Sequence, residues 1–136
     1  MSPSPSGHIR LRFRLVLGRD VAIGPGKADL LAAVAETGSI SAAGRSMGMS
    51  YKKAWYLLDT MNRCFREPLV EASKGGRGHG GATLTPMGRE VLARYRAIEA
   101  RASADVADEL AAFAALAIDN LAAGGPLKEQ AGPEAD

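Results

Sequence analysis

The feature that most constrains this chain is a run of three helix-length segments separated by only a few residues. Apolar residues recur at helical spacing over about 26–37. Ser39 is a favourable N-cap for a second, short helix that should stop at Gly48, and Ser50 is one for a third helix over 51–65. Because the joints are so short, we expect the three helices to pack against one another as one unit.

The segment before these helices alternates between apolar and arginine residues. This period-two pattern over 9–17 is typical of a half-buried β-strand with an outward row of arginines. The alternating residues are Ile9, Leu11, Phe13, Leu15 and Leu17 on one side and Arg10, Arg12 and Arg14 on the other. After turn-like stretches, Pro25 and Gly38 mark the expected start and end of the first helix.

A glycine-rich hairpin is predicted after the third helix. The strand candidates PLVEAS and ATLTP flank a loop with five glycines between 75 and 81, which indicates a hairpin with a long, mobile tip. Thr85 and Pro86 suit the start of another helix. An apolar row then keeps helical spacing to about 122, either as one long helix or as two helices broken near Ser103.

The order of strand, three helices, hairpin and helix predicts a winged helix-turn-helix. This is a mainly α fold with a small antiparallel sheet, here followed by a long C-terminal helix or helices for dimerisation. We expect a DNA-binding domain over 9–100, a dimerisation helix over 101–122, a flexible N-terminus over 1–8 and a disordered tail over 123–136. The apolar stripe of the last helix must be buried, and in a small chain a partner subunit is the expected place.

In this fold the third helix can enter a DNA major groove, where the residues at its N-terminal end reach base edges first. Those residues are Ser50, Tyr51, Lys52 and Lys53. Ser39, at the start of the second helix, is a further candidate contact. Lysine reaches guanine acceptors or phosphates, hydroxyl groups bind either, and a helix N-terminus attracts phosphate. The sequence therefore predicts double-stranded DNA as the partner.

The distribution of charge agrees with a nucleic-acid partner. The formal net charge is only +2, but residues 50–98 contain nine Lys/Arg against four Asp/Glu, and residues 99–136 contain two against eight. A clustered basic segment is the electrostatic footprint of a nucleic-acid binder. The tip of the hairpin, here called the wing, adds Lys74, Arg77 and His79, which we expect to follow the DNA backbone or an adjacent minor groove.

Two stretches carry a family resemblance: GSISAAGRSMGMSYKKAW and PLVEASKGGRGHGGATLTPMGREVL. Over roughly 9–100 the chain resembles the N-terminal domain of ModE-family molybdate-responsive transcriptional regulators and, more distantly, LysR-type helix-turn-helix domains. The resemblance implies a cytoplasmic homodimer that binds a palindromic operator. In that family Mop-type domains bind the oxyanion after this region. This chain departs there, with only an alanine-rich helix and a tail after about residue 100, so molybdate sensing is not carried over and the effector stays open.

Plainer interpretations exist for several of these residues. Lys52 and Lys53 can be surface lysines of an amphipathic helix, and His79 a solvated loop residue. Trp55 lies beside the apolar stripe, and we expect it in the core rather than in contact with DNA. Cys64 is interpreted as a small, buried hydrophobic residue. The wing glycines lack the GK[ST] ending of a phosphate-binding loop.

Other function classes have little support in the sequence. Cys64, His8 and His79 are too few for a zinc site of about four ligands, and the single cysteine points to the reducing cytosol. Neither a signal peptide nor a membrane span is visible. Because no paired carboxylates or nucleophile-base pair stand out, we expect neither an enzyme nor a cofactor. The alternative function is a winged-helix protein-interaction module without sequence-specific DNA binding.

Overall fold

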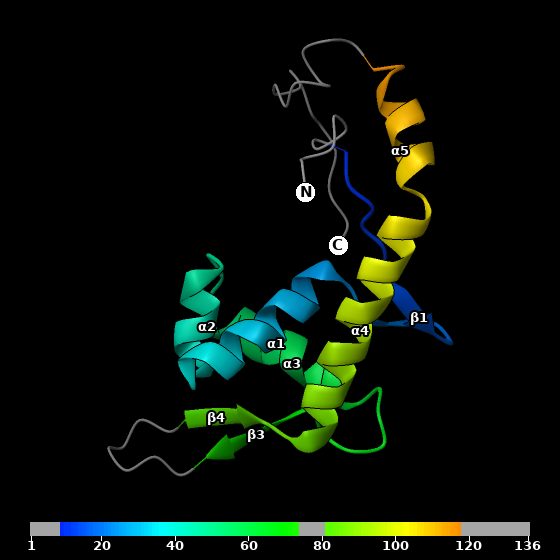
Figure 1. The fold of residues 1–136 in the computed structure, drawn as a ribbon. Coiled ribbons are helices and arrows are strands. Elements are labelled where there is room, and N and C mark those ends of the chain that lie inside the picture. Colours follow the sequence, from blue (N-terminus) through cyan, green and yellow to red (C-terminus); the bar gives the residue numbers. More distant parts are fainter. Residues whose placement is uncertain (1–8, 74–80, 118–136) are drawn as a thin grey trace. The chain divides into compact units, whose positions relative to one another are not determined.

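The computed structural model describes residues 9–73 and 81–117. Within them the chain forms five helices and two antiparallel hairpins, as Figure 1 shows. In chain order the elements are β1 (Leu15–Leu17), β2 (Asp20–Ile23), α1 (Pro25–Thr37), α2 (Ile40–Ser46), α3 (Tyr51–Asn62), β3 (Val70–Ser73), β4 (Gly81–Leu84), α4 (Pro86–Asp105) and α5 (Ala107–Ala114). The mainly helical winged helix-turn-helix expected from the sequence is confirmed.

Residues 13–96 form one compact unit, and residues 9–12 and 97–117 are the described part of a second. In the first unit, α1, α2 and α3 cluster together (Figure 1). The β3–β4 hairpin packs against α1 through β4, and the backbone N–H of Ala82 donates to the carbonyl oxygen of Gly38 at 3.0 Å. This arrangement joins the base of the wing to the end of α1.

The predicted caps set the boundaries of the clustered helices. Gly38 ends α1 in the left-handed region, with φ of 72°, where a side chain would be strained. The hydroxyl oxygen of Ser39 accepts from the N–H of Ala42 at 3.0 Å, and that of Ser50 accepts from the N–H of Lys53 at 3.1 Å. α3 ends at Asn62, three residues before the predicted end.

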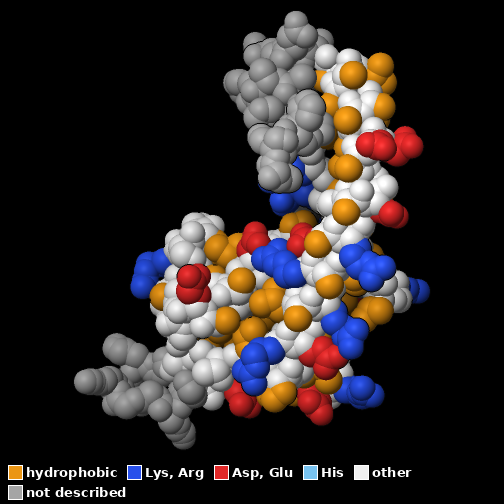
Figure 2. Space-filling model, viewed as in Figure 1, with side chains coloured by type: hydrophobic (Ala, Val, Ile, Leu, Met, Phe, Trp, Pro, Cys, Tyr) orange, Lys and Arg blue, Asp and Glu red, His pale blue; other side chains and the backbone are white. Residues whose placement is uncertain are grey.

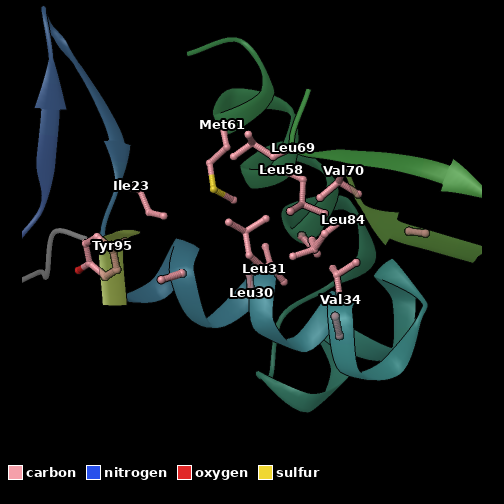
Figure 3. Close-up of a cluster of buried hydrophobic side chains, with 14 residues drawn as sticks. Ile23, Leu30, Leu31, Val34, Leu58, Met61, Leu69, Val70, Leu84 and Tyr95 are labelled. Carbon is pink, nitrogen blue, oxygen red and sulfur yellow. The ribbon is translucent and has the colours of Figure 1, made fainter. Parts of the chain in front are cut away.

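The hydrophobic core lies between the helices and the β3–β4 hairpin. Figure 3 shows side chains from α1, α3, β3 and β4 pointing toward one another. Tyr95 of α4 is also buried, and its hydroxyl donates to the carbonyl oxygen of Phe13 at 2.8 Å. The largest fully buried side chains are Tyr95, Ile23, Leu30, Leu31, Met61, Leu69 and Val34.

Small residues let α2 and α3 approach closely. A Cβ added at Gly44 would lie 3.2 Å from Cβ of Ala54 and 3.3 Å from the carbonyl oxygen of Met49. The N–H of Met49 donates to the carbonyl oxygen of Gly44 at 2.9 Å, which closes the turn. The predicted tight joint around Gly48 and Met49 is therefore confirmed, with Gly48 in the left-handed region at φ of 72°.

The N-terminal strand is shorter than predicted. Only Leu15–Leu17 of the expected 9–17 strand are paired, and their partner is β2, a strand that was not predicted from the sequence. A strand can pair only along the length of its neighbour, and β2 ends at Ile23 because Pro25 occupies the first turn of α1. The expected alternation holds over 9–15, where Arg10, Arg12 and Arg14 are exposed between half-buried apolar residues, but it ends before Leu17, which is exposed.

The C-terminal apolar row runs through two helices rather than one. α4 ends at Asp105, and α5 begins at Ala107, so the break falls at Val106, three residues after the predicted position. The expected flexible N-terminus over 1–8, the tail over 123–136 and the end of the predicted dimerisation helix after residue 117 lie outside the described residues.

Membrane-spanning helices and clusters of metal ligands are both absent from the described residues. Within residues 9–73 and 81–117, no helix is long and apolar enough to cross a membrane. The same ranges contain no group of three or more His, Cys, Asp or Glu side chains that could hold a metal ion.

Candidate nucleic-acid interface

The N-terminal turn of α3 presents the predicted reading residues to solvent. Tyr51, Lys52 and Lys53 are all exposed. Ser50 precedes them, and its side-chain oxygen is engaged with the N–H of Lys53, so its role in the folded chain is to cap the helix. Its hydroxyl proton remains available for donation to a phosphate or a base. Tyr51, Lys52 and Lys53 thus form a polar and aromatic surface, and Ser50 stabilises the helix turn that carries them.

The two sides of α3 differ sharply. Ala54, Leu58 and Met61 are buried against α1 and the rest of the core. Trp55 is 48% exposed and Tyr51 is 56% exposed, so the prediction that Trp55 belongs to the core is wrong. The sequence did contain the signal: Trp55 follows Ala54, and one residue turns the helix by about 100°, which carries the indole away from the buried stripe.

A groove of about 690 Å³ opens beside this aromatic pair. Ser39, the N-cap of α2, and Arg45, in the last turn of α2, line this groove, and the strands at the base of the wing contribute Ala72 and Gly81. Among the described residues, the guanidinium of Arg45 makes only a long contact of 3.4 Å to the hydroxyl oxygen of Ser41. The full lining is Ser39, Ile40, Ser41, Arg45, Tyr51, Trp55, Ala72 and Gly81.

No acidic side chain is among the residues that line the groove or form the first turn of α3. Residues 38–58 contain Arg45, Lys52 and Lys53 and no Asp or Glu. A surface with one sign of charge raises the local concentration of a polyanion and speeds its association. Arg45 was not among the predicted site residues, because its sequence position alone does not reveal the groove that it lines.

The base of the wing is fixed by side chains from neighbouring elements. The side-chain oxygen of Asn62 accepts from the N–H groups of Leu69 at 2.8 Å and Val70 at 3.3 Å. The hydroxyl of Thr85 donates to the carbonyl oxygen of Pro68 at 2.7 Å and accepts from the N–H of Gly88 at 2.9 Å, so it also caps α4. These contacts tie β3 to the end of α3 and to the start of α4.

The strands of the wing pair in a regular antiparallel register from Val70 opposite Leu84 to Ser73 opposite Gly81. The predicted wing contacts Lys74, Arg77 and His79 lie outside the described residues. The register confirms the predicted hairpin at its base.

A second cavity, of about 580 Å³, lies at the other flank of α3. Burial lowers the pKa of the Lys27 ammonium group there, and electrostatic interactions with Cys64 and Asp20 oppose this shift. A hydrogen bond from Arg63 to Asp59, 2.7 Å long, raises the pKa of Arg63. The hydroxyl of Thr60 donates to the carbonyl oxygen of Leu57. Because these polar groups already have partners, this cavity is a weaker candidate than the groove.

Comparison with known proteins bears on the same region. The model of the bacterial regulatory helix-turn-helix protein family of the lysR type matches residues 27–89, from α1 into α4. The molybdenum-pterin-binding protein MopB of Rhodobacter capsulatus is 50% identical over 78 residues, which cover 57% of this chain and 29% of that protein.

Two further relatives share the region. The molybdenum transport protein ModE of Azotobacter vinelandii is 42% identical over 92 residues, covering 65% of this chain and 34% of that protein. The DNA-binding transcriptional dual regulator ModE of Escherichia coli K12 is 41% identical over 71 residues, which cover 52% of this chain and 27% of that protein. The matched region thus spans about a third or less of each relative.

Proposed function

We propose that the chain is a sequence-specific DNA-binding transcriptional regulator, supported by its match to the lysR-type helix-turn-helix model over residues 27–89 and by its similarity to ModE and Mop proteins. In this proposal the N-terminal turn of α3 enters a major groove. Lys52 and Lys53 contact bases or phosphates there, together with Tyr51 and the hydroxyl of Ser50.

The observation that carries the proposal is the exposed, capped start of α3 in a region without acidic side chains. A buried stripe holds the helix from behind, so its outer face is presented as a rigid surface. Ser39 lies at the start of α2, where helix-turn-helix domains approach the DNA backbone, and we assign it and the wing residues Lys74, Arg77 and His79 to phosphate contacts.

We further propose that the protein acts as a homodimer on a palindromic operator. Residues 9–100 would bind DNA, and the apolar row that starts in α4 and continues over 101–122 would pair two subunits. A two-fold dimer places two recognition helices about one DNA turn apart, which is the geometry of a palindromic site. As a cytoplasmic regulator it would act on genes of molybdenum homeostasis, in line with the names of its relatives.

The proposal is tested by selecting bound duplexes from a random DNA library with the full chain. We expect a palindromic consensus whose affinity falls steeply with salt, because phosphate contacts release counterions. Lys52→Ala should weaken binding to this duplex by about tenfold or more, the range of a lost base contact. Arg94→Ala is the matched control, since Arg94 is an exposed cation of α4 that pairs with Glu90.

The contribution of the wing to DNA binding is tested through the salt dependence of the affinity. Neutralising Lys74 and Arg77 together should reduce the slope of log affinity against log salt by about 2 without changing base preference. An unchanged slope would reject the wing contact. Recovery of no consensus, with weak binding to all sequences, would instead favour the winged-helix protein-interaction module.

A further inference from the structure

We propose that Tyr51 and Trp55 form an apolar reading face on α3 that recognises the 5-methyl groups of thymine in the major groove. The inference deepens the proposed function and rests on it. It assigns a role to Trp55, a residue that the sequence alone had placed in the core, and it commits to one chemical feature of the operator.

The starting observation is that the two large aromatic side chains that line the groove, Tyr51 and Trp55, are exposed. Trp55 and Tyr51 are both about half exposed although they lie on a helix whose other side is tightly packed. Among the described residues, neither the indole N–H of Trp55 nor the hydroxyl of Tyr51 takes part in a hydrogen bond. Exposed aromatic surface of this size is typical of a binding site.

The position of the pair on the helix suits a base-reading role. Tyr51 is the first residue of α3, and Trp55 follows one turn later on the same side. Four residues of an α-helix rise by about 6 Å, and successive base pairs of B-DNA are about 3.4 Å apart. The two side chains therefore span about two neighbouring base pairs, and apolar side chains contact the thymine methyl group, which projects into the major groove.

The groove beside the pair supplies the polar half of the same site. Arg45 of α2 lines it together with Tyr51 and Trp55, and its guanidinium has only the long contact to Ser41. An anionic backbone along this groove would meet Arg45 while the bases meet the aromatic pair. Residues 38–58 contain Arg45, Lys52 and Lys53 and no Asp or Glu, and this excess of positive charge favours a polyanion as the occupant.

The test compares thymine with deoxyuridine, which lacks only the 5-methyl group. Duplexes recovered by selection with the full chain are synthesised with each thymine replaced in turn by deoxyuridine. For the wild-type chain we expect about fourfold weaker binding at one or two positions per half-site, because burial of one methyl group is worth about 0.8 kcal/mol.

The assignment of this effect to Trp55 uses three variants. Trp55→Ala should bind the thymine duplex more weakly and lose the deoxyuridine penalty at one of those positions. Trp55→Phe, which keeps an aromatic surface, should retain most of the penalty. Val16→Ala is the control, because Val16 is an exposed apolar residue of β1 outside the groove. Circular dichroism spectra verify that each variant is folded.

The outcomes separate this inference from the proposed function. If the wild type binds a selected duplex but tolerates every deoxyuridine, methyl recognition is wrong and DNA binding stands. If Trp55→Ala keeps the full penalty at every position, Trp55 is not the reader. If the selection recovers no preferred sequence, the proposed function itself fails and the inference fails with it.

Discussion

The tightest steric constraint on a single residue lies at Gly88, in the first turn of α4. A Cβ added there would collide with the carbonyl oxygen of Leu69 and lie 3.0 Å from the carbonyl carbon. That carbonyl oxygen also accepts from the N–H of Thr85 at 2.9 Å, so it cannot move without loss of a hydrogen bond. Gly88 therefore permits the close approach of α4 to the strand at the base of the wing.

Gly88→Ala should lower the free energy of unfolding by about 3 kcal/mol, the upper end of the cost of overpacking. Gly26→Ala is the matched control, because Gly26 lies in the first turn of α1 with no atom within 4 Å of the added Cβ. It should raise the free energy of unfolding by about 0.5 kcal/mol through loss of unfolded-state entropy. Urea denaturation measures both, and equal effects of the two substitutions would contradict the steric argument.

Asn62 links two elements, because its side chain belongs to α3 and its hydrogen-bond partners begin β3. Leu69 is fully buried, so its N–H has no water to replace Asn62. Asn62→Ala should lower the free energy of unfolding by about 1–3 kcal/mol, the cost of an unsatisfied buried donor. The amides of Leu69 and Val70 should also exchange faster with deuterium in NMR experiments.

Asn62→Asp provides the control, since a carboxylate keeps an acceptor oxygen at nearly the same place. We expect it to retain most of the amide protection. If Asn62→Ala left the exchange of both amides unchanged, the contact would not hold the base of the wing.

Elements whose limits are set locally were predicted well from the sequence. The side-chain oxygen of Ser39 accepts from the N–H of Ala42, three residues along the chain, and Gly38 ends α1 through its own backbone conformation. Both boundaries therefore depend on residues that are adjacent in the sequence. The β1–β2 pair was missed because pairing depends on a second segment, and Asp20–Ile23 is too short to show a periodic pattern. The break at Val106 was approximate because no proline or glycine marks it.

The candidate site was predictable in part for the same reason. The exposure of Tyr51, Lys52 and Lys53 was predictable, because these residues form the first turn of a capped helix. The structure has all three on the surface. The groove was not predictable, because it joins α2, α3 and the wing strands, which are distant in sequence. Arg45 and the exposed Trp55 become candidate site residues only because the fold brings them together in this groove.

On the scale of the whole molecule, charge is divided unequally between the two parts of the chain. Residues 13–96 contain thirteen Lys/Arg against seven Asp/Glu, whereas the remaining residues contain four against eight. The C-terminal helices also expose apolar groups, and Figure 2 shows them along the α4–α5 segment. Phe113 is 66% exposed and Leu116 is 82% exposed, and no residue of α5 is buried.

An exposed apolar helix of this kind is unfavourable in water unless a partner covers it. In a two-fold dimer each substitution acts twice, and burial of one phenylalanine is worth about 1.5–3 kcal/mol. Phe113→Glu should therefore weaken self-association by at least about hundredfold, which sedimentation equilibrium measures. Asp108→Asn, a polar change in the same helix, should leave self-association unaltered.

Binding to a palindromic duplex should weaken in Phe113→Glu while binding to a single half-site stays constant, because only the coupling between subunits is lost. A wild-type chain that sediments as a monomer at high concentration would contradict the dimer.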